Sequence, residues 1–138
     1  MFRTPIHITD FDARRLQAVL ARYEHLPASS HREVNRLRRE LERARIVPSR
    51  EVGEQVVTMN SVVVLRDLDS GQEFTCRLSF PDEADADAGR LSVLAPVGTA
   101  ILGYREGSVI EWDVPKGTRR IRIEKVLYQP EAAGDYHL

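Results

Sequence analysis

The spacing of apolar residues changes once along this chain, near residue 48. Before that point apolar side chains recur every three or four positions, which is the period of an amphipathic helix. The first such stripe comprises Leu16, Val19, Leu20 and Tyr23. The second comprises Val34, Leu37, Leu41 and Ala44. Two apolar stripes joined by a short loop predict an antiparallel helical hairpin.

Local signals indicate where the two helices begin and end. Thr9 can cap the first helix, which should stop before Pro27 because proline disfavours helical geometry in the preceding residue. Ser29 or Ser30 can cap the second helix, which we expect Pro48 to end. At about 1.5 Å per residue each arm is only about 20–24 Å long. Arms this short do not form an independent coiled coil, so the base of the hairpin should pack on the rest of the fold.

From Glu54 onward the pattern favours strands. Apolar and polar residues alternate strictly over residues 73–80, which predicts a strand with one face in water. The expected strands cover residues 56–65, 73–80, 91–94, 109–114 and 121–127. A short helix is expected at residues 97–102. The prediction is an α+β fold, with a helical hairpin at residues 1–48 and a small antiparallel sheet around one short helix at residues 49–138.

Composition narrows the class of protein. The formal net charge of −1 argues against a protein that binds nucleic acid over its whole surface, because such proteins are usually basic. The sequence has no apolar run long enough to span a membrane, and its first residues do not resemble a signal peptide. A single cysteine, Cys76, cannot form an internal disulfide, which fits a reducing compartment. We therefore expect a cytoplasmic protein with no membrane partner.

No group of residues indicates catalysis or metal binding. The acidic loop at residues 82–87 lacks the ligand spacing and central glycine of a calcium loop. The four histidines have no zinc-ligand spacing. Cys76 falls on the apolar face of its predicted strand, which favours a buried core thiol over a nucleophile. We expect no catalytic residue, no metal ion and no cofactor.

The second predicted helix is rich in arginine. A basic face there can contact phosphates or an acidic rim on a partner. Three glutamates dilute the charge, and no aromatic residue interleaves it as a platform for stacked bases would require. The pattern therefore favours a solvated helix face. If the hairpin does contact a partner, the candidate residues are Arg32, Arg36 and Arg39, together with Glu24 in the loop.

The run from Leu91 to Gly103, followed by Gly107, Trp112 and a Pro-x-Gly turn ending at Gly117, resembles the C-terminal domain of the Gre transcript-cleavage factors. The chain is still more similar to their shortened relatives, the Rnk family (regulators of nucleoside diphosphate kinase). Two further stretches carry the narrower resemblance, residues 56–61 and residues 128–136. The resemblance implies that the sheet and its helix have the FKBP-like fold of the Gre C-terminal domain.

The resemblance also implies a partner. Gre factors insert a helical hairpin into the secondary channel of RNA polymerase, where acidic residues at the tip help to hold a catalytic magnesium ion. Here the tip, residues 24–30, contains one carboxylate, Glu24, and the arms are short. The implied function is that of a non-catalytic elongation regulator that binds RNA polymerase near the secondary channel and competes with or modulates Gre factors. The protein would then contact nucleic acid only as part of the transcription complex.

On this resemblance the loop that touches the polymerase comprises Leu94, Ala95, Pro96 and Val97. The alternative is that Pro96 simply begins a helix, a position that proline favours, and both interpretations can hold together.

Two other functions stay open. The family name implies regulation of nucleoside diphosphate kinase, through direct or indirect contact. A weak stimulation of transcript cleavage through Glu24 is another alternative. Prolyl isomerase activity is disfavoured because the few aromatic residues do not suggest a ring around a substrate proline. For the tail at residues 129–136, packing of Tyr136 on the domain and contact with a partner both remain possible.

Overall fold

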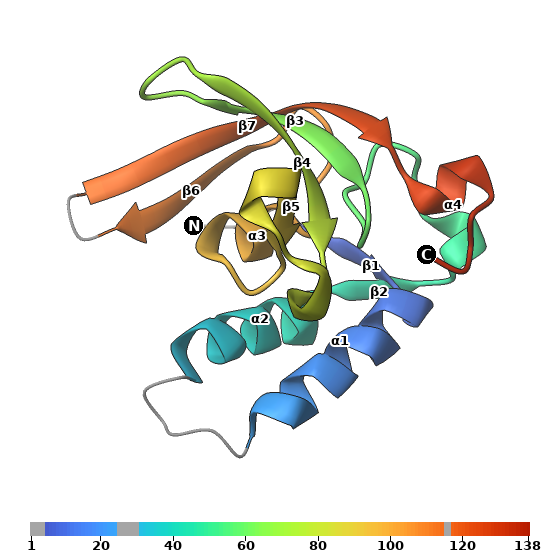
Figure 1. Ribbon diagram of the computed structural model, residues 1–138. Coiled ribbons are helices and arrows are strands. Elements are labelled where there is room, and N and C mark those ends of the chain that lie inside the picture. The colour runs from blue at the N-terminus through green and yellow to red at the C-terminus, as the bar shows by residue number, and fades with distance from the viewer. Residues whose placement is uncertain (1–4, 25–30, 115–116) are drawn as a thin grey trace.

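The computed structural model describes residues 5–24, 31–114 and 117–138 (Figure 1). Its helices are α1 (Asp10–Tyr23), α2 (His31–Arg43), α3 (Pro96–Ile101) and α4 (Pro130–Ala133). Its strands are β1 (His7–Thr9), β2 (Arg45–Val47), β3 (Val62–Asp67), β4 (Glu73–Ser79), β5 (Arg90–Ser92), β6 (Val109–Val114) and β7 (Gly117–Tyr128). Single turns of 3-10 helix are η2 (Ser49–Glu51), η3 (Pro81–Glu83) and η4 (Ala86–Ala88).

The described elements form the predicted α+β arrangement. A five-stranded sheet has the order β5-β4-β3-β7-β6, and α3 lies between this sheet and the α1–α2 hairpin (Figure 1). The expectation of an entirely antiparallel sheet was wrong, because β5 runs parallel to β4 and the sheet is mixed. The cause is the connection: residues 80–89 carry the chain back through η3 and η4, and a crossover of this kind brings the next strand in parallel.

The hairpin begins as predicted and ends differently. The Thr9 hydroxyl caps α1 by accepting a hydrogen bond from the Asp12 amide at 3.0 Å, and the helix ends at Tyr23, before Pro27. The predicted caps of α2, Ser29 and Ser30, lie outside the described residues.

The helix α2 ends at Arg43 and does not continue to Pro48. The chain leaves the helix because β2 pairs in parallel with β1.

The segment 56–61 is not the first half of a long strand, as the sequence suggested. The strand β3 begins only at Val62, and the preceding residues form a buried turn. Asn60 has a φ of 67°, the left-handed conformation that asparagine tolerates better than most residues. The hydroxyl of Ser61 accepts a hydrogen bond from the Thr58 amide at 2.9 Å, which closes the turn. Side-chain and backbone bonds of this kind override the strand preference of a β-branched run.

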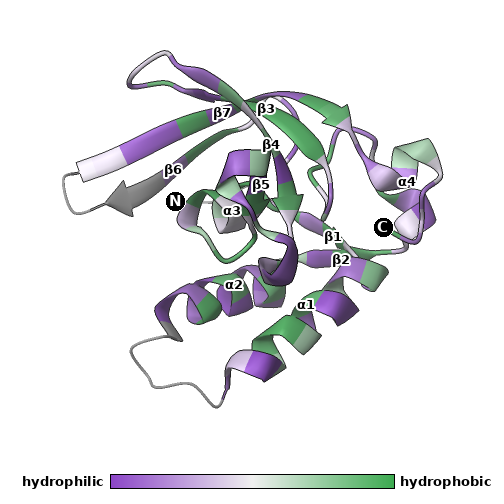
Figure 2. Cartoon of the chain, in the orientation of Figure 1, coloured by the Kyte–Doolittle hydropathy of each residue, from purple (hydrophilic) through white to green (hydrophobic). Residues whose placement is uncertain are grey.

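One continuous core joins the hairpin to the sheet. Leu16 of α1 and Leu37 of α2 are fully buried in the same apolar cluster as Met59 and Leu65. Both hairpin helices alternate hydrophilic and hydrophobic residues along their length, as an amphipathic helix does (Figure 2). The expected packing of the hairpin base on the rest of the fold is therefore confirmed, and the apolar cluster crosses the boundary at residue 48.

Candidate functional site

The loop that the Gre resemblance singles out lies at the start of α3. Pro96 is the first residue of the helix and is exposed, while Ala95 and Val97 on either side are half-buried. Leu94 differs from these three, because its side chain is 6% exposed and belongs to the core. The predicted position of Pro96 at the start of a helix is confirmed. The part of this loop that a partner can reach is Ala95, Pro96 and Val97, with Leu94 as their anchor.

Hydrogen bonds hold this loop from both sides. The Ser92 hydroxyl accepts from the Leu94 amide at 3.1 Å, and the Ser92 carbonyl accepts from the Ala95 amide at 3.0 Å. The Thr99 hydroxyl reaches back from α3 and donates to the Val93 carbonyl at 2.5 Å. Every one of these bonds ties the loop to its own flanking segments. The exposed Pro96 is therefore held in place by hydrogen bonds within the protein itself.

Two glycines allow the close packing around α3. A Cβ atom built on Gly98 would lie 2.1 Å from the Ser92 carbonyl oxygen, a contact that no side chain can make. Gly103 has a φ of +81°, and a Cβ there would lie 2.8 Å from the Cβ of Ile6. Gly98 therefore allows close packing of α3, and Gly103 allows the left-handed backbone that follows the helix.

Three arginines of α2 lie on a common side of that helix. Arg32, Arg36 and Arg39 are spaced by four and three residues, so they lie on one side of the helix. Arg32 and Arg39 are exposed, whereas Arg36 is half-buried and its Nη1 is buried without a hydrogen-bond partner. Arg43 continues this side of the helix and donates to the Tyr104 hydroxyl at 2.7 Å. We call Arg32, Arg36 and Arg39 the α2 arginine face.

The structure places two groups of the predicted site residues on neighbouring elements. The helices α2 and α3 pack against each other, so the Pro96 loop and the α2 arginine face lie on neighbouring elements (Figure 1). Glu24 directly follows the last residue of α1 and is exposed. It lies where the hairpin turns, beside residues 25–30, which are outside the described part of the chain.

A buried polar network lies where the hairpin, the sheet and the tail meet. One carboxylate oxygen of Asp12 accepts from the Met59 amide at 3.0 Å, and the other accepts from Arg15 Nη2 at 2.6 Å. Arg15 Nη2 also donates to the Leu138 carbonyl at 2.8 Å, which accepts from Asn60 Nδ2 at 2.6 Å as well. Asp12 therefore connects α1 to the turn before β3, and Arg15 connects α1 to the tail.

The same turn also holds the tail through α4. The Thr58 hydroxyl donates to the Glu131 carboxylate at 2.7 Å. The Gln129 side-chain amide donates to the Val56 carbonyl at 2.8 Å. Tyr136 packs back on the domain, with the guanidinium of Arg50 4.5 Å from its ring centroid. The two stretches that carried the narrower family resemblance, 56–61 and 128–136, are therefore bound to each other.

Burial changes the ionisation of the two carboxyl groups in this network. Burial raises the pKa of the Asp12 carboxyl, although the Met59 amide and Arg15 both oppose the change. Burial also raises the pKa of the Glu131 carboxyl, against the hydrogen bond from Thr58. Sequence reasoning missed this network, since its hydrogen bonds join residues far apart in the chain. The available signal was the presence of two distinctive stretches with no assigned chemistry.

Replacing Glu131 with glutamine should change how the stability of the protein depends on pH. A carboxyl whose pKa is raised on folding holds its proton more tightly when folded, so it costs stability as pH rises above its ordinary value of 4.5. Glutamine keeps the acceptor for Thr58 and has no charge to bury. We therefore expect the free energy of unfolding of Glu131→Gln, relative to wild type, to increase from pH 4.5 upward and then level off in urea titrations.

Asp67 supplies a control of opposite sign for that experiment. The hydrogen bond from Arg119 lowers the pKa of the Asp67 carboxyl, so its ionised form stabilises the fold above its ordinary value of 3.8. Asp67→Asn should therefore lose stability relative to wild type as pH rises towards 3.8, and the difference should stay constant above that value. A Glu131→Gln variant that behaves like Asp67→Asn would contradict the assignment of Glu131 as a carboxyl destabilised by burial.

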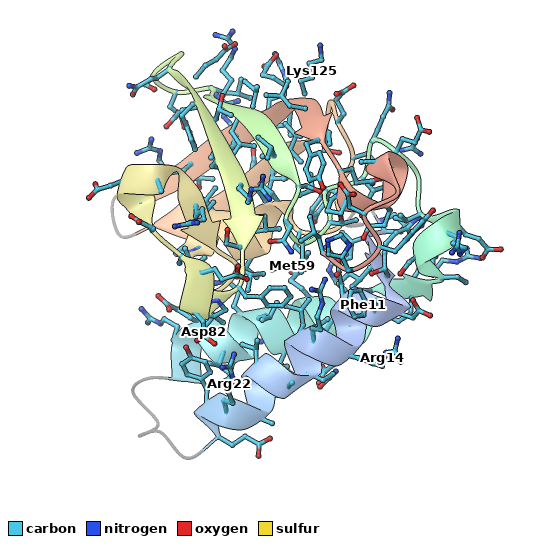
Figure 3. All side chains as sticks on the ribbon, turned by 45° about the vertical axis from the view of Figure 1, so that its right-hand side comes forward. Phe11, Arg14, Arg22, Met59, Asp82 and Lys125 are labelled. Atoms are coloured by element: carbon cyan, nitrogen blue, oxygen red, sulfur yellow. The ribbon has the colours of Figure 1, made fainter. Side chains whose placement is uncertain are left out.

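The remaining candidate residues are where the sequence predicted them. Cys76 is buried, and burial raises the pKa of its thiol to about 11, which fits a core thiol. The acidic loop is exposed, and its Asp82 pairs with Arg22 of α1 at 2.7 Å (Figure 3). In the part of the chain that the structure describes, no group of three His, Cys, Asp or Glu side chains is placed to hold a metal ion. No helix formed by those residues is long and apolar enough to cross a membrane.

The fold is that of a Gre-related protein: a short helical hairpin packs on a small sheet, with α3 between them. Comparisons with known proteins agree. The family model described as "Transcription elongation factor, GreA/GreB, C-term" matches residues 42–128, and the model described as "Rnk N-terminus" matches residues 4–47. The chain belongs to the Rnk family, the regulators of nucleoside diphosphate kinase, which combines these two parts.

Individual relatives support the same assignment. The "Regulator of nucleoside diphosphate kinase" of Escherichia coli (strain K12) is 40% identical over 141 residues, and the match covers all of both chains. A transcription elongation factor GreA from Desulfotalea psychrophila is 36% identical over 90 residues, which are 65% of this chain and 56% of that protein. The solved structure of a GreA/GreB elongation factor from Nitrosomonas europaea superposes with a TM-score of 0.71 at 40% identity, covering 91% of this chain and all of that one.

Proposed function

We propose that this protein binds RNA polymerase near the secondary channel and there competes with or modulates Gre factors, without stimulating transcript cleavage. The observation that carries this proposal is the Pro96 loop, which stands exposed and prearranged at the start of α3 in a domain of the Gre type. A rigid loop loses little conformational freedom when it binds, which favours affinity. The contact residues would be Ala95, Pro96 and Val97, positioned by Leu94.

The α2 arginine face is proposed as the second contact. Arg32 and Arg39 are exposed on the helix that packs beside α3, so one partner surface can meet both the loop and the helix. Their guanidinium groups suit an acidic rim, and the contact would weaken as salt is added. The face is mixed with glutamates, which argues for a protein surface and against free nucleic acid.

The proposed absence of cleavage stimulation rests on the hairpin. The helices α1 and α2 contain 14 and 13 residues, which gives arms of only about 20 Å. Of residues 24–30, only Glu24 carries a carboxylate. A magnesium ion needs several oxygen ligands, so a single carboxylate on a short arm supplies little of its coordination shell. If weak stimulation does occur, Glu24→Ala should abolish it in a cleavage assay with backtracked complexes.

The loop contact predicts a mutation that weakens polymerase binding. Pro96→Arg places a long charged side chain at the exposed start of α3. It should weaken equilibrium binding to core RNA polymerase at least about 10-fold, which is the effect of losing a central interface residue. Leu127→Arg is the matched control, because Leu127 is an exposed apolar residue of β7 and gains the same charge. Tight binding by wild type and by Leu127→Arg, with loss in Pro96→Arg, is the expected result. Absence of binding by folded wild type would reject the proposal.

The alternative function is regulation of nucleoside diphosphate kinase by direct contact. It is favoured by the full-length relative whose name states that role. A direct complex between this protein and the kinase, measured with both proteins purified, would support it. Polymerase binding without a kinase complex would instead indicate that any effect on the kinase is an indirect result of transcription control.

A further inference from the structure

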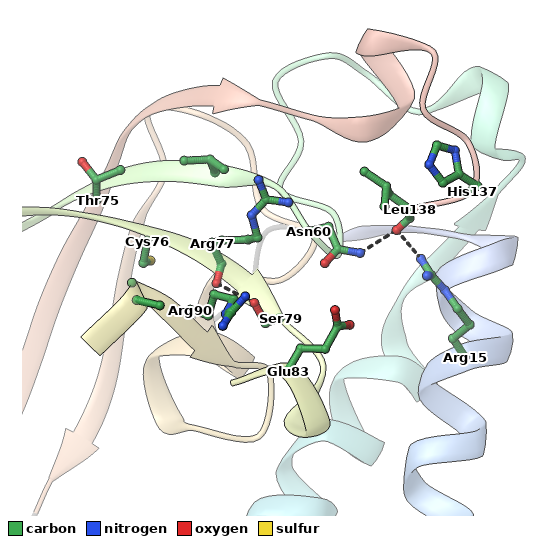
Figure 4. A pocket seen from close by; sticks show the side chains of 13 residues that line it. Arg15, Asn60, Thr75, Cys76, Arg77, Ser79, Glu83, Arg90, His137 and Leu138 are labelled. Atoms are coloured by element: carbon green, nitrogen blue, oxygen red, sulfur yellow. Dashed lines mark hydrogen bonds between the residues drawn. The ribbon is translucent and has the colours of Figure 1, made fainter. Parts of the chain in front are cut away.

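A groove of about 540 Å³ opens between β4, the segment that joins η4 to β5, and the end of the tail (Figure 4). Arg77 and Arg90 lie with Ser79 on one side of it, Arg15 lies with the Leu138 carbonyl on the other, and Glu83 lies between them. The volume is in the range of small-molecule sites, about 300–1,000 Å³. The groove is separate from the Pro96 loop and from the α2 arginine face, because no residue of either lines it.

The charged groups of the groove are mainly basic. Arg15, Arg77 and Arg90 come from three different elements, and Glu83 is the acidic side chain that lines the groove with them. Arg90 forms a long ion pair with Asp85 at 3.7 Å, and Arg15 forms an ion pair with Asp12. Within the described residues Arg77 meets no carboxylate, and its guanidinium instead lies 5.5 Å from the ring centroid of Tyr128. Among the described residues, no carboxylate pairs with the Arg77 guanidinium, which leaves its charge available to an anionic ligand.

We propose that this groove binds a small organic phosphate. A guanidinium presents two parallel N–H donors that match the oxygens of a phosphate group, and such charge-assisted bonds are among the stronger ones available in water. Arg77 and Arg90 would hold the phosphate. Glu83 repels an anion and accepts hydrogen bonds, so the ligand body should present a donor to it, as the hydroxyl groups of a sugar do. The ligand class is therefore a hydroxyl-bearing phosphate ester such as a sugar phosphate.

The test is an NMR titration of the full chain with ribose 5-phosphate and with inorganic phosphate. Saturable shifts of backbone amides between residues 75 and 90 are expected with both probes, and tighter binding is expected for ribose 5-phosphate. Equal affinities would indicate a site for the phosphate group alone and would overturn the sugar-phosphate assignment. The absence of saturable shifts at these amides with either probe would overturn the whole proposal.

Three variants sharpen this test. Arg77→Gln should weaken the binding of inorganic phosphate about 10-fold, since one charge-assisted hydrogen-bond pair is lost. Glu83→Gln should strengthen it, because the repelling charge is removed, and misfolding cannot produce opposite changes in the two variants. Arg14→Gln is the matched control, since Arg14 is exposed on α1 and lies outside the groove (Figure 3). A loss in Arg14→Gln equal to that in Arg77→Gln would show a general charge effect and overturn the site.

Discussion

Replacing Asp12 with alanine is expected to lower the free energy of unfolding by about 3 kcal/mol. The substitution leaves the buried Met59 amide without an acceptor and removes the carboxylate that pairs with Arg15. It also removes a negative charge from the first turn of α1, where the helix dipole favours an anion. Urea titration at pH 7 measures the change directly.

Asp12→Asn is the control that separates the effect of the Met59 hydrogen bond from that of the ion pair with Arg15. Its amide oxygen can still accept from Met59, and only the ion pair with Arg15 is lost, so the cost should be clearly smaller than for alanine. Equal costs for the two variants would mean that the Met59 bond contributes nothing. A loss below about 0.5 kcal/mol for Asp12→Ala, which is typical of an unremarkable surface site, would contradict the role of this network.

Gly98→Ala is expected to destabilise the domain by about 3 kcal/mol, the upper part of the range for overpacked sites. The added methyl group would lie 2.1 Å from the Ser92 carbonyl oxygen, and this neighbour is backbone, which cannot rotate away. Either α3 or the strand β5 must therefore shift. Because both flank the Pro96 loop, the proposed contact of that loop with RNA polymerase predicts that the same substitution weakens polymerase binding under conditions where the protein remains folded.

Gly53→Ala is the matched control for Gly98→Ala. A Cβ on Gly53 would lie 3.6 Å from Val56 Cγ2, an ordinary van der Waals distance, and the residue does not need a positive φ. Its stability should stay within about 0.5 kcal/mol of wild type. If Gly98→Ala is as stable as Gly53→Ala in urea titrations, the tight packing of α3 on the Ser92 carbonyl is not a constraint on this fold.

The local features of the fold were predictable from the sequence. The stripe that contains Leu16 and Leu20 predicted α1, and Thr9 and Pro27 bracketed it correctly, because caps and helix stops depend on a few adjacent residues. Strict alternation predicted β4, whose described bounds differ from the expected strand by one residue.

Features that depend on distant segments were not predictable. The strands β1 and β2 contain three residues each, too few to show an alternating pattern, and they exist because they pair with each other. The parallel pairing of β5 depends on the path of the loop before it. The Asp12–Met59 bond joins residues 47 positions apart, and no periodicity in the sequence records such a contact. The relative placement of the Pro96 loop and the α2 arginine face likewise depends on how α2 packs on α3.

The most direct test of the central proposal is displacement of a labelled Gre factor from core RNA polymerase by this protein. If both occupy the rim of the secondary channel through the same kind of loop, wild-type protein should displace the Gre factor completely at saturation, and Pro96→Arg should require at least about 10-fold more protein. A Gre factor that stays fully bound while folded wild-type protein is present at saturating concentration would contradict a shared site on the polymerase.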